Sequence, residues 1–355
     1  MAKVTIKDIA ARTGVSISTV SRVMNGNPSV APEITESVLA AARELGYRTA
    51  SPAAPLNEAP GRRIALILPT FANSYYPSIA EGVIDAAREK GLTVTVLLFN
   101  SDFDLELSCL ELLSRSPVDG IIFAPGDDRV PLERFPSLKN VPVVIAARRA
   151  VLPGVPHVYA DNVSAGYIAT KYMLRLQRKR IALFLNFWGD KIHDFATFEE
   201  RYRTGKQGAC TAFDRYTGYR RALEEENIPF DPDLLVYSGF THEAGYSAAQ
   251  ELLASPNRFD GVLITNDRCA TGVVQLFNEQ GIEVPNQVSV ICFNGGLLAS
   301  AVTPSLTMIE QDNYRLGKEA AEQLSALMEG RPAEDRMIDV RLVIKSSTAM
   351  GSGEI

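Results

Sequence analysis

The chain has 355 residues, a formal net charge of −6, and an ordinary globular balance of 46% hydrophobic and 22% charged residues. This length exceeds one ordinary core and predicts two or three domains. No apolar run is long enough to span a membrane, and the opening MAKVTIKDIA lacks the apolar core of a secretion signal, so we expect a cytoplasmic protein with no membrane partner.

The sequence lacks the motifs of an enzyme. It contains no P-loop, no GxSxG and no HExxH, and its three histidines do not have metal-ligand spacing. The four cysteines lie far apart, which favours buried reduced thiols over a disulfide or a metal site: Cys109, Cys210, Cys269 and Cys292. We therefore expect no catalysis, no metal and no cofactor.

The first 50 residues are more basic than the rest. They carry six lysines or arginines against four acids, a balance of +2, which leaves −8 for the other 305 residues. This asymmetry favours a small head that meets a polyanion, attached to an acidic body.

Three short helices are predicted in this head. Thr5 caps a helix over IKDIAARTG that ends at Gly14, and a second helix begins at Ser16 in SISTVSRVMN. A third helix follows Pro32 and stops at Gly46. The residues expected to face inward recur at helical spacing: Ile6, Ile9, Ala10, Val15, Val20, Val23, Val38, Leu39, Ala42 and Leu45. The order predicts a helix-turn-helix.

The second helix keeps an unusual set of side chains on its outer face: Ile17, Ser18, Ser21 and Arg22. Small side chains let a helix approach the major groove closely, hydroxyls donate to phosphates, and arginine can bind a guanine edge. The alternative is a three-helix protein-binding module with a solvated polar face.

Residues 51–60, SPAAPLNEAP, hold three prolines and one large apolar residue, Leu56. This composition predicts a linker. From Arg62 onward, short apolar runs alternate with amphipathic segments; the runs are IALILP, TVTVLLFN, GIIFAP, VPVVIAA, IALFLNF, LLVYSG, GVLIT and VSVICF. They predict parallel sheets covered by helices on both faces, in two similar lobes that meet near Asp161, with a ligand cleft beyond the strand ends.

The stretch TIKDIAARTGVSISTVSRVMNG, continued by LAAARELGY, resembles the DNA-binding head of the LacI/GalR family of bacterial repressors. RYTGYRRAL, TNDRCATGVVQLFNEQGIEVPNQVSVICFN and TPSLTMIEQD extend the resemblance over nearly the whole chain. It implies an all-α helix-turn-helix head (1–48), a hinge (49–61) and an α/β, periplasmic-binding-protein-like effector domain (62–355). By the same resemblance the N-lobe spans 62–161 and 295–323, and the C-lobe spans 162–294 and 324–350.

The resemblance also implies roles for residues of the head and hinge. Ile17, Ser18 and Arg22 would read bases, and the backbone would be held by Thr5, Ser16, Thr19, Ser21 and Asn25. Leu56 stands where the family inserts a leucine into the minor groove from a hinge helix. Pro52 and Pro55 depart from the family pattern, which leaves a shortened hinge or a plain flexible tether open.

Candidate effector contacts stand just after the predicted strands, at positions that the family uses: Tyr75, Tyr76, Arg148, Arg215, Phe240, Asn266, Asp267 and Asn294. A carboxylate accepts hydrogen bonds from adjacent hydroxyls, and arginine donates two parallel ones. Aromatic rings cover an apolar face, so this set of side chains suits a sugar. The simpler alternatives are core packing for the tyrosines, ion pairs for the arginines and a helix cap for Asp267.

Four departures from the family occur in the body. Ala147 and Asn294 stand where an acid is usual, and Gln177–Arg178 replace a usual Gly-His. The stretch 186–214 is longer than the family's connection and contains the chain's only tryptophan, Trp188. It predicts either a lid with Trp188 facing the ligand or an excursion packed on the C-lobe or a partner subunit.

The resulting hypothesis is a transcriptional repressor that binds a pseudo-palindromic DNA operator as a homodimer, since no heptad tail follows DVRLVIKSST. A carbohydrate effector in the cleft would change the lobe angle. Two alternatives stay open. One is a solute sensor whose head does not read DNA, and the other is a regulator that requires a purine or nucleoside corepressor.

Overall fold

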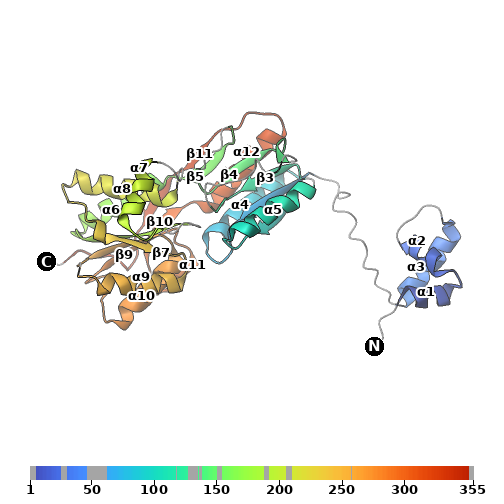
Figure 1. Ribbon diagram of the computed structural model, residues 1–355, viewed down its shortest axis with the longest axis horizontal. Coiled ribbons are helices and arrows are strands. Elements are labelled where there is room, and N and C mark those ends of the chain that lie inside the picture. Colours follow the sequence, from blue (N-terminus) through green and yellow to red (C-terminus); the bar gives the residue numbers. More distant parts are fainter. Residues whose placement is uncertain are drawn as a thin grey trace. The chain divides into compact units, whose positions relative to one another are not determined.

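The computed structural model describes residues 5–24, 30–45, 62–116, 118–126, 135, 138–149, 154–187, 192–204, 210–256 and 258–351. The chain divides into two compact units, residues 1–60 and 61–355 (Figure 1). Three residues with expected roles, Asn25, Leu56 and Trp188, lie outside the described residues.

The first unit is the expected three-helix head, with α1 (Ile6–Thr13), α2 (Ile17–Met24) and α3 (Pro32–Glu44). Its core is formed by Ile9, Ala10, Val20, Val23, Val38, Ala41 and Ala42. The expectation for Leu39 was wrong, because this side chain is exposed and Ala41 is buried instead. Residues 38, 41, 42 and 45 lie on one face of a helix, and residue 39 lies outside that stripe.

Capping residues fix both ends of α1 and the start of α2. The Asp8 carboxylate accepts from the backbone N–H and the hydroxyl of Thr5, each at 2.7 Å. The hydroxyl, followed by the backbone N–H, holds the pKa of Asp8 below its usual range. Gly14 has a φ of 74° and its N–H donates to the Ala10 carbonyl at 2.9 Å. Ser16 Oγ then accepts from the Thr19 N–H at the start of α2, at 3.1 Å.

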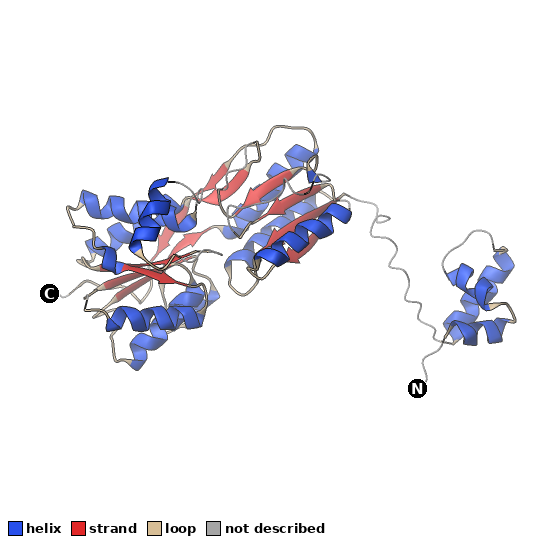
Figure 2. Cartoon of the chain, viewed as in Figure 1, coloured by secondary structure: helices blue, strands red, loops and turns tan. Residues whose placement is uncertain are grey.

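The second unit contains two six-stranded sheets, each covered by helices on both faces (Figure 2). The N-lobe sheet has the order β11-β5-β4-β3-β1-β2 and all its pairs are parallel. Its elements are β1 (Arg63–Leu68), α4 (Tyr75–Glu89), β2 (Thr93–Leu98), α5 (Phe103–Arg115), β3 (Gly120–Phe123), β4 (Val143–Ala146), β5 (His157–Ala160), α12 (Asn313–Met328) and β11 (Arg336–Ile338). Helices α4 and α12 cover one face and α5 covers the other.

The C-lobe sheet has the order β12-β10-β9-β8-β6-β7, with β12 antiparallel to β10. Its elements are α6 (Asn162–Arg175), β6 (Ile181–Asn186), α7 (Phe195–Thr204), α8 (Thr211–Glu225), β7 (Leu235–Ser238), α9 (His242–Ala254), β8 (Gly261–Ile264), α10 (Asp267–Glu279), β9 (Ser289–Phe293), α11 (Leu297–Ala301), β10 (Thr307–Gln311) and β12 (Val340–Val343). Helices α9 and α10 cover one face, and α6, α7 and α8 cover the other.

The strand order corrects the expected lobe boundaries. Strand β10 belongs to the C-lobe sheet and β11 belongs to the N-lobe sheet. The segment 295–311 therefore lies in the C-lobe rather than the N-lobe, and 324–338 lies in the N-lobe rather than the C-lobe. The chain crosses between lobes at three places, after β5, after β10 and between β11 and β12.

Gln177 and Arg178, which replace the family's usual Gly-His, have distinct conformations and contacts in the structure. Gln177 takes a φ of 62°, the left-handed conformation that favours glycine. Arg178 is buried and donates to the carbonyls of Pro285 at 2.8 Å, Asn286 at 2.9 Å and Gln287 at 3.0 Å. This arginine therefore ties the loop before β9 to the end of α6.

The insertion after β6 packs on the C-lobe where it is described. Phe198 of α7 is fully buried and stacks on Tyr202, with ring centroids 6.1 Å apart. It also contacts Phe213 at 5.3 Å and Tyr216 at 4.8 Å, both on α8. These contacts favour the excursion packed on the C-lobe for α7. The lid hypothesis for Trp188 stays a prediction.

Helices α6 and α8 approach through two glycines. A Cβ on Gly166 would lie 2.1 Å from the carbonyl oxygen of Arg215, and one on Gly218 would lie 2.0 Å from that of Val163. The same reciprocal arrangement recurs between α4 and α12, at Gly82 and Gly317, and between α9 and α10, at Gly245 and Gly272. Because a Cβ cannot occupy these positions, glycine sets the distance between the paired helices.

We expect Gly218→Ala to lower the free energy of unfolding by about 3 kcal/mol, because the new methyl group overpacks the helix contact. Intrinsic helix propensity has the opposite sign and would give a gain of about 1 kcal/mol. Urea denaturation followed by circular dichroism distinguishes the two. The matched control is Arg175→Ala at an exposed position of the partner helix α6, which should change stability by less than about 0.5 kcal/mol. A stabilised Gly218→Ala protein would contradict the close-contact argument.

Candidate functional site

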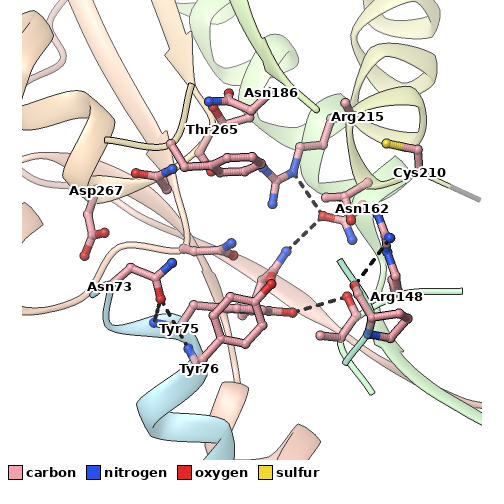
Figure 3. Close-up of a pocket in the computed structure, with 18 residues that line it drawn as sticks. Asn73, Tyr75, Tyr76, Arg148, Asn162, Asn186, Cys210, Arg215, Thr265 and Asp267 are labelled. Carbon is pink, nitrogen blue, oxygen red and sulfur yellow. Dashed lines mark hydrogen bonds between the residues drawn. The ribbon is translucent and has the colours of Figure 1, made fainter. Parts of the chain in front are cut away.

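A pocket lies between the two lobes at the carboxyl ends of their strands (Figure 3). It encloses about 790 Å³ of atom-free space, including its open mouth. Its lining residues are Asn73, Tyr75, Tyr76, Pro125, Ala147, Arg148, Asn162, Asn186, Cys210, Thr211, Ala212, Arg215, Phe240, Thr265, Asn266, Asp267, Asn294 and Gln311. In both sheets the first strand lies between the second and third strands of its lobe, and such switch points are where doubly wound sheets bind ligands.

The base of the pocket is a hydrogen-bonded cluster of Asn162, Arg215 and Gln311. Asn162 Oδ1 accepts from Arg215 Nε and from Gln311 Nε2, each at 3.0 Å, and Asn162 Nδ2 donates to the Ala160 carbonyl at 3.1 Å. Asn162 follows the first crossover and Gln311 precedes the second. The cluster therefore links the first crossover between the lobes to the second.

Arg215 is held in the first turns of α8, with a side chain that is almost fully buried. Besides its bond to Asn162, it donates to the Thr265 carbonyl at 3.0 Å, and its guanidinium lies 4.3 Å from the Phe293 ring centroid. Burial lowers its pKa to about 10, so it stays charged at neutral pH. Its described hydrogen-bond acceptors are neutral, which leaves a cation able to bind a polar ligand.

The N-lobe wall is aromatic. Asn73 Oδ1 accepts from the N–H groups of Tyr75 at 3.2 Å and Tyr76 at 3.4 Å, which fixes the first turn of α4. The two rings meet edge to face at 4.9 Å. Burial raises the pKa of Tyr76 to about 12 and also raises the pKa of Tyr75. Both phenols therefore keep their protons at neutral pH and act as hydrogen-bond donors.

The end of β4 contributes Ala147 and Arg148. Ala147 has a φ of 72°, and its carbonyl accepts from Tyr75 Oη at 3.4 Å. Arg148 is buried and donates to the Pro125 carbonyl at 3.4 Å. Figure 3 shows Arg148 and Arg215 on the same side of the pocket, with Asp267 on the opposite side.

Four polar atoms on the C-lobe wall are buried without a hydrogen-bond partner among the described residues: Asn186 Oδ1, Thr265 Oγ1, Asn266 Nδ2 and Asn294 Oδ1. In two of these residues the other side-chain atom is already bonded: Asn266 Oδ1 accepts from the Cys269 N–H at 2.7 Å, and Asn186 Nδ2 donates to the Gly239 carbonyl. Each unsatisfied buried group costs about 1–3 kcal/mol. A ligand that supplies hydroxyl donors and acceptors would remove this cost.

Asp267 begins α10 and is 1% exposed. Its Oδ2 accepts from Ser74 Oγ at 2.8 Å and from the Gly296 N–H at 3.1 Å, and its Oδ1 accepts from the Arg268 N–H at 2.8 Å. Ser74 belongs to the other lobe. The carboxylate therefore already has three donors, and the helix cap proposed as the alternative for Asp267 is made by Asn266 instead.

The pocket contains nearly all the expected effector contacts. Tyr75, Tyr76, Arg148, Arg215, Phe240, Asn266, Asp267 and Asn294 all line it, and Trp188 lies outside the described residues. Sequence reasoning missed Asn73, Asn162, Asn186, Thr265 and Gln311. Asn186 and Gln311 are the last residues of β6 and β10 and Thr265 directly follows β8, so the same strand-end rule could have found them.

The head presents the expected outer face on α2. Ile17 is 50% exposed, Ser18 and Arg22 are exposed, and Ser21 is half-buried. Ser16 Oγ lies 2.8 Å from both Ser18 Oγ and Thr19 Oγ1. Thr5 is exposed at the start of α1. The contacts of these residues with DNA stay predictions.

Within the described ranges, no helix has the length and apolar character needed to cross a membrane. The same ranges contain no group of three or more histidine, cysteine, aspartate or glutamate side chains placed to hold a metal ion.

Comparison with known proteins gives matches for both units. Residues 5–50 match the model of bacterial regulatory proteins, lacI family, and residues 170–348 match a periplasmic binding protein-like domain. The HTH-type transcriptional regulator RegA of Clostridium saccharobutylicum is 31% identical over 97% of this chain and 98% of its own length. The ribose operon repressor of Halalkalibacterium halodurans is 28% identical over 98% of each chain.

A solved structure, the transcriptional regulator CelR–cellobiose complex, is similar over the full length. It has a TM-score of 0.70 and 26% sequence identity, and the match covers 97% of this chain and 99% of the other. The combination of head and two-lobed body is thus shared with this regulator.

The Asn162 cluster predicts a specific cost of mutation. Asn162→Ala removes the acceptor of Arg215 Nε and Gln311 Nε2, and should lower the free energy of unfolding by about 2–4 kcal/mol. Asn278→Ala, at an exposed position of α10, is the matched control and should change it by less than about 0.5 kcal/mol. Equal effects of the two substitutions in urea denaturation would show that the cluster does not hold the pocket together.

Proposed function

The chain belongs to the LacI family of bacterial transcriptional regulators, and on that premise we propose that it represses transcription as a homodimer controlled by a hydroxyl-rich effector in the interlobe pocket. The family consists of DNA-binding regulators and not of enzymes. The observation that carries the proposal is the set of four unsatisfied polar atoms on the C-lobe wall, opposite the two tyrosines.

The chemistry of the pocket favours a sugar. Asn186 Oδ1 and Asn294 Oδ1 require donors, Asn266 Nδ2 requires an acceptor and Thr265 Oγ1 can do either. Adjacent hydroxyls of a sugar ring supply both kinds of group. Tyr75, Tyr76 and Phe240 offer aromatic surface for the apolar face of the ring. The names of the ribose operon repressor and of the CelR–cellobiose complex agree with this class.

A purine or nucleoside corepressor is the second candidate. Its favouring observation is the aromatic N-lobe wall, because flat rings stack on tyrosine as well as sugars do. A sugar hydroxyl, however, can both donate and accept, whereas each edge group of a purine base does only one of the two. We therefore place carbohydrate first.

DNA binding is proposed to use the outer face of α2. Exposed Ser18 and Arg22 would contact base edges, with Ile17 against apolar groups in the major groove. Thr5, Ser16, Thr19, Ser21 and Asn25 are proposed to contact the backbone, and Leu56 is proposed as a minor-groove wedge.

The dimer proposal is supported by exposed apolar side chains at one edge of the N-lobe. Leu98 ends the edge strand β2 and is 36% exposed, while Leu105 and Leu112 on α5 are 44% and 51% exposed. Residues 105 and 112 are two helical turns apart and share a face of α5. Apolar side chains beside an open strand edge are typical of a protein interface.

Selection of binding sites from random DNA by the full-length protein, at a stated salt concentration, tests the DNA proposal. We expect a palindrome of fixed half-site spacing. Arg22→Gln should weaken binding by about 1–3 kcal/mol and relax one position of each half-site. The control is Arg12→Gln, because Arg12 pairs with Glu44 within the head. Equal losses for both variants would argue against a base contact by Arg22.

The same selection tests the hinge. With a Leu56 wedge, Leu56→Ala should lose preference at the central base step and keep the half-sites. Variable spacing with the native protein would instead identify residues 51–60 as a tether.

Thermal unfolding with ribose, glucose, galactose, cellobiose and hypoxanthine tests the effector class. A carbohydrate at one hundred times its Kd should stabilise the body by about 2.7 kcal/mol. Phe240→Ala should abolish the shift, whereas Phe71→Ala, outside the lining residues, should keep it. Stabilisation by hypoxanthine alone would favour the corepressor. Trp188 emission that is insensitive to every stabilising ligand would rule out the lid.

A further inference from the structure

Three loops meet beside the pocket, on the boundary between the lobes. The loop before α4 brings Ser74 from the N-lobe, the start of α10 brings Asp267, and the turn after β9 brings Gly296. Ser74 Oγ and the Gly296 N–H both donate to Oδ2 of Asp267, at 2.8 and 3.1 Å. We name these three residues the Ser74 latch.

Gly296 lies against a side chain that leaves no room for a Cβ. Its φ is −116°, outside the left-handed region, and its ψ is −145°. A Cβ on Gly296 would nevertheless lie 2.1 Å from Oγ and 2.4 Å from Cβ of Ser74, and 3.2 Å from Oδ2 of Asp267. The side chain nearest to this Cβ position is that of Ser74, which belongs to the opposite lobe.

The latch contact exists only when the lobes are together. If the lobes separated, Asp267 would keep its bonds from Gly296 and Arg268, which belong to the C-lobe, and would lose the bond from Ser74. A hydrogen bond to a carboxylate is among the stronger ones in proteins, and this carboxylate is buried. Loss of the Ser74 donor would therefore favour the open form measurably.

A second contact across the lobes is weaker. Arg149 Nη2 lies 2.8 Å from Asp214 Oδ1, and their side chains are 43% and 18% exposed. Exposed ion pairs contribute little because water and salt screen them. The Ser74 latch is the better-buried contact of the two.

The latch also separates two cavities. Asp267 lines the effector pocket, whereas Ser74 and Gly296 line a second cavity together with Ser78, Gly295, Asn313 and Arg341. Gln311 lines both. The three latch residues thus stand in the wall between the effector pocket and the second cavity.

We propose that Ser74, Asp267 and Gly296 form a latch that holds the lobes closed, so that Ser74 and Gly296 act as positioning residues for the effector pocket. The inference rests on the proposed function, in which lobe closure transmits effector binding. It assigns roles to two residues, one in each lobe, that do not line the effector pocket themselves.

The distance between the lobes tests the latch without any effector. Spin labels are attached to Arg88→Cys on α4 and Glu251→Cys on α9, both exposed positions, in a Cys109→Ser background. The full-length labelled protein is diluted with an excess of unlabelled protein, so that each dimer carries one labelled chain. Double electron–electron resonance then gives the distribution of distances.

Gly296→Ala should shift the distribution to longer distances, because its methyl group collides with Ser74. Adding Ser74→Gly removes the colliding atoms, so the double variant should return toward shorter distances. Ser74→Ala keeps the shape and removes one hydrogen bond to a carboxylate, and should raise the ratio of open to closed chains roughly ten-fold. Ser108→Ala, on the exposed face of α5, is the matched control and should leave the distances unchanged.

Unchanged distances in both Gly296→Ala and Ser74→Ala would overturn the latch. So would a double variant that stays as open as Gly296→Ala, because the collision would then not involve Ser74. If Gly296→Ala fails to fold, Ser74→Ala decides alone. The readout needs neither DNA nor effector, so a protein that fails to select DNA while showing these shifts would refute only the proposed function.

Discussion

A buried guanidinium needs acceptors, and the pocket is organised around that need. Arg215 finds them in Asn162 and the Thr265 carbonyl, and Asn162 in turn accepts from Gln311. This arrangement requires α8 to approach α6 closely, which the missing side chain of Gly166 allows, because it faces the carbonyl of Arg215 itself. The contact between α6 and α8, the first two crossovers and the polar base of the pocket therefore all depend on where Arg215 is held.

Much of the fold could be predicted from sequence because its strands are buried on both faces and appear as apolar runs. Strands β5, β10, β11 and β12 were not predicted, because a polar or charged residue interrupts the apolar character of each one. The expected lobe boundaries came from the family resemblance, and without these four strands the residue pattern could not correct them. Which sheet a short strand joins depends on its pairing partners. Strand β10 pairs with β9 and β12. The residue pattern of β10 alone does not encode these partners.

The pocket residues divide in the same way. The strand-end rule places Arg148, Phe240 and Asn266 in the pocket because parallel strands bring their carboxyl ends to one edge. The strand-end rule did not single out amides such as Asn186, because asparagine is also common in turns. The bond between Ser74 and Asp267 joins residues 193 positions apart, so only the folded chain reveals it. Contacts between lobes depend on the angle at the crossovers, and no local pattern reports that angle.

The three crossovers also order events during synthesis. The N-lobe sheet needs β11 and the C-lobe sheet needs β12, and these are the latest of the described strands to leave the ribosome. The head helices, by contrast, emerge first. At roughly 5–20 residues per second, tens of seconds separate the two events. A nascent chain would therefore display a finished head long before either lobe has received all the strands of its sheet.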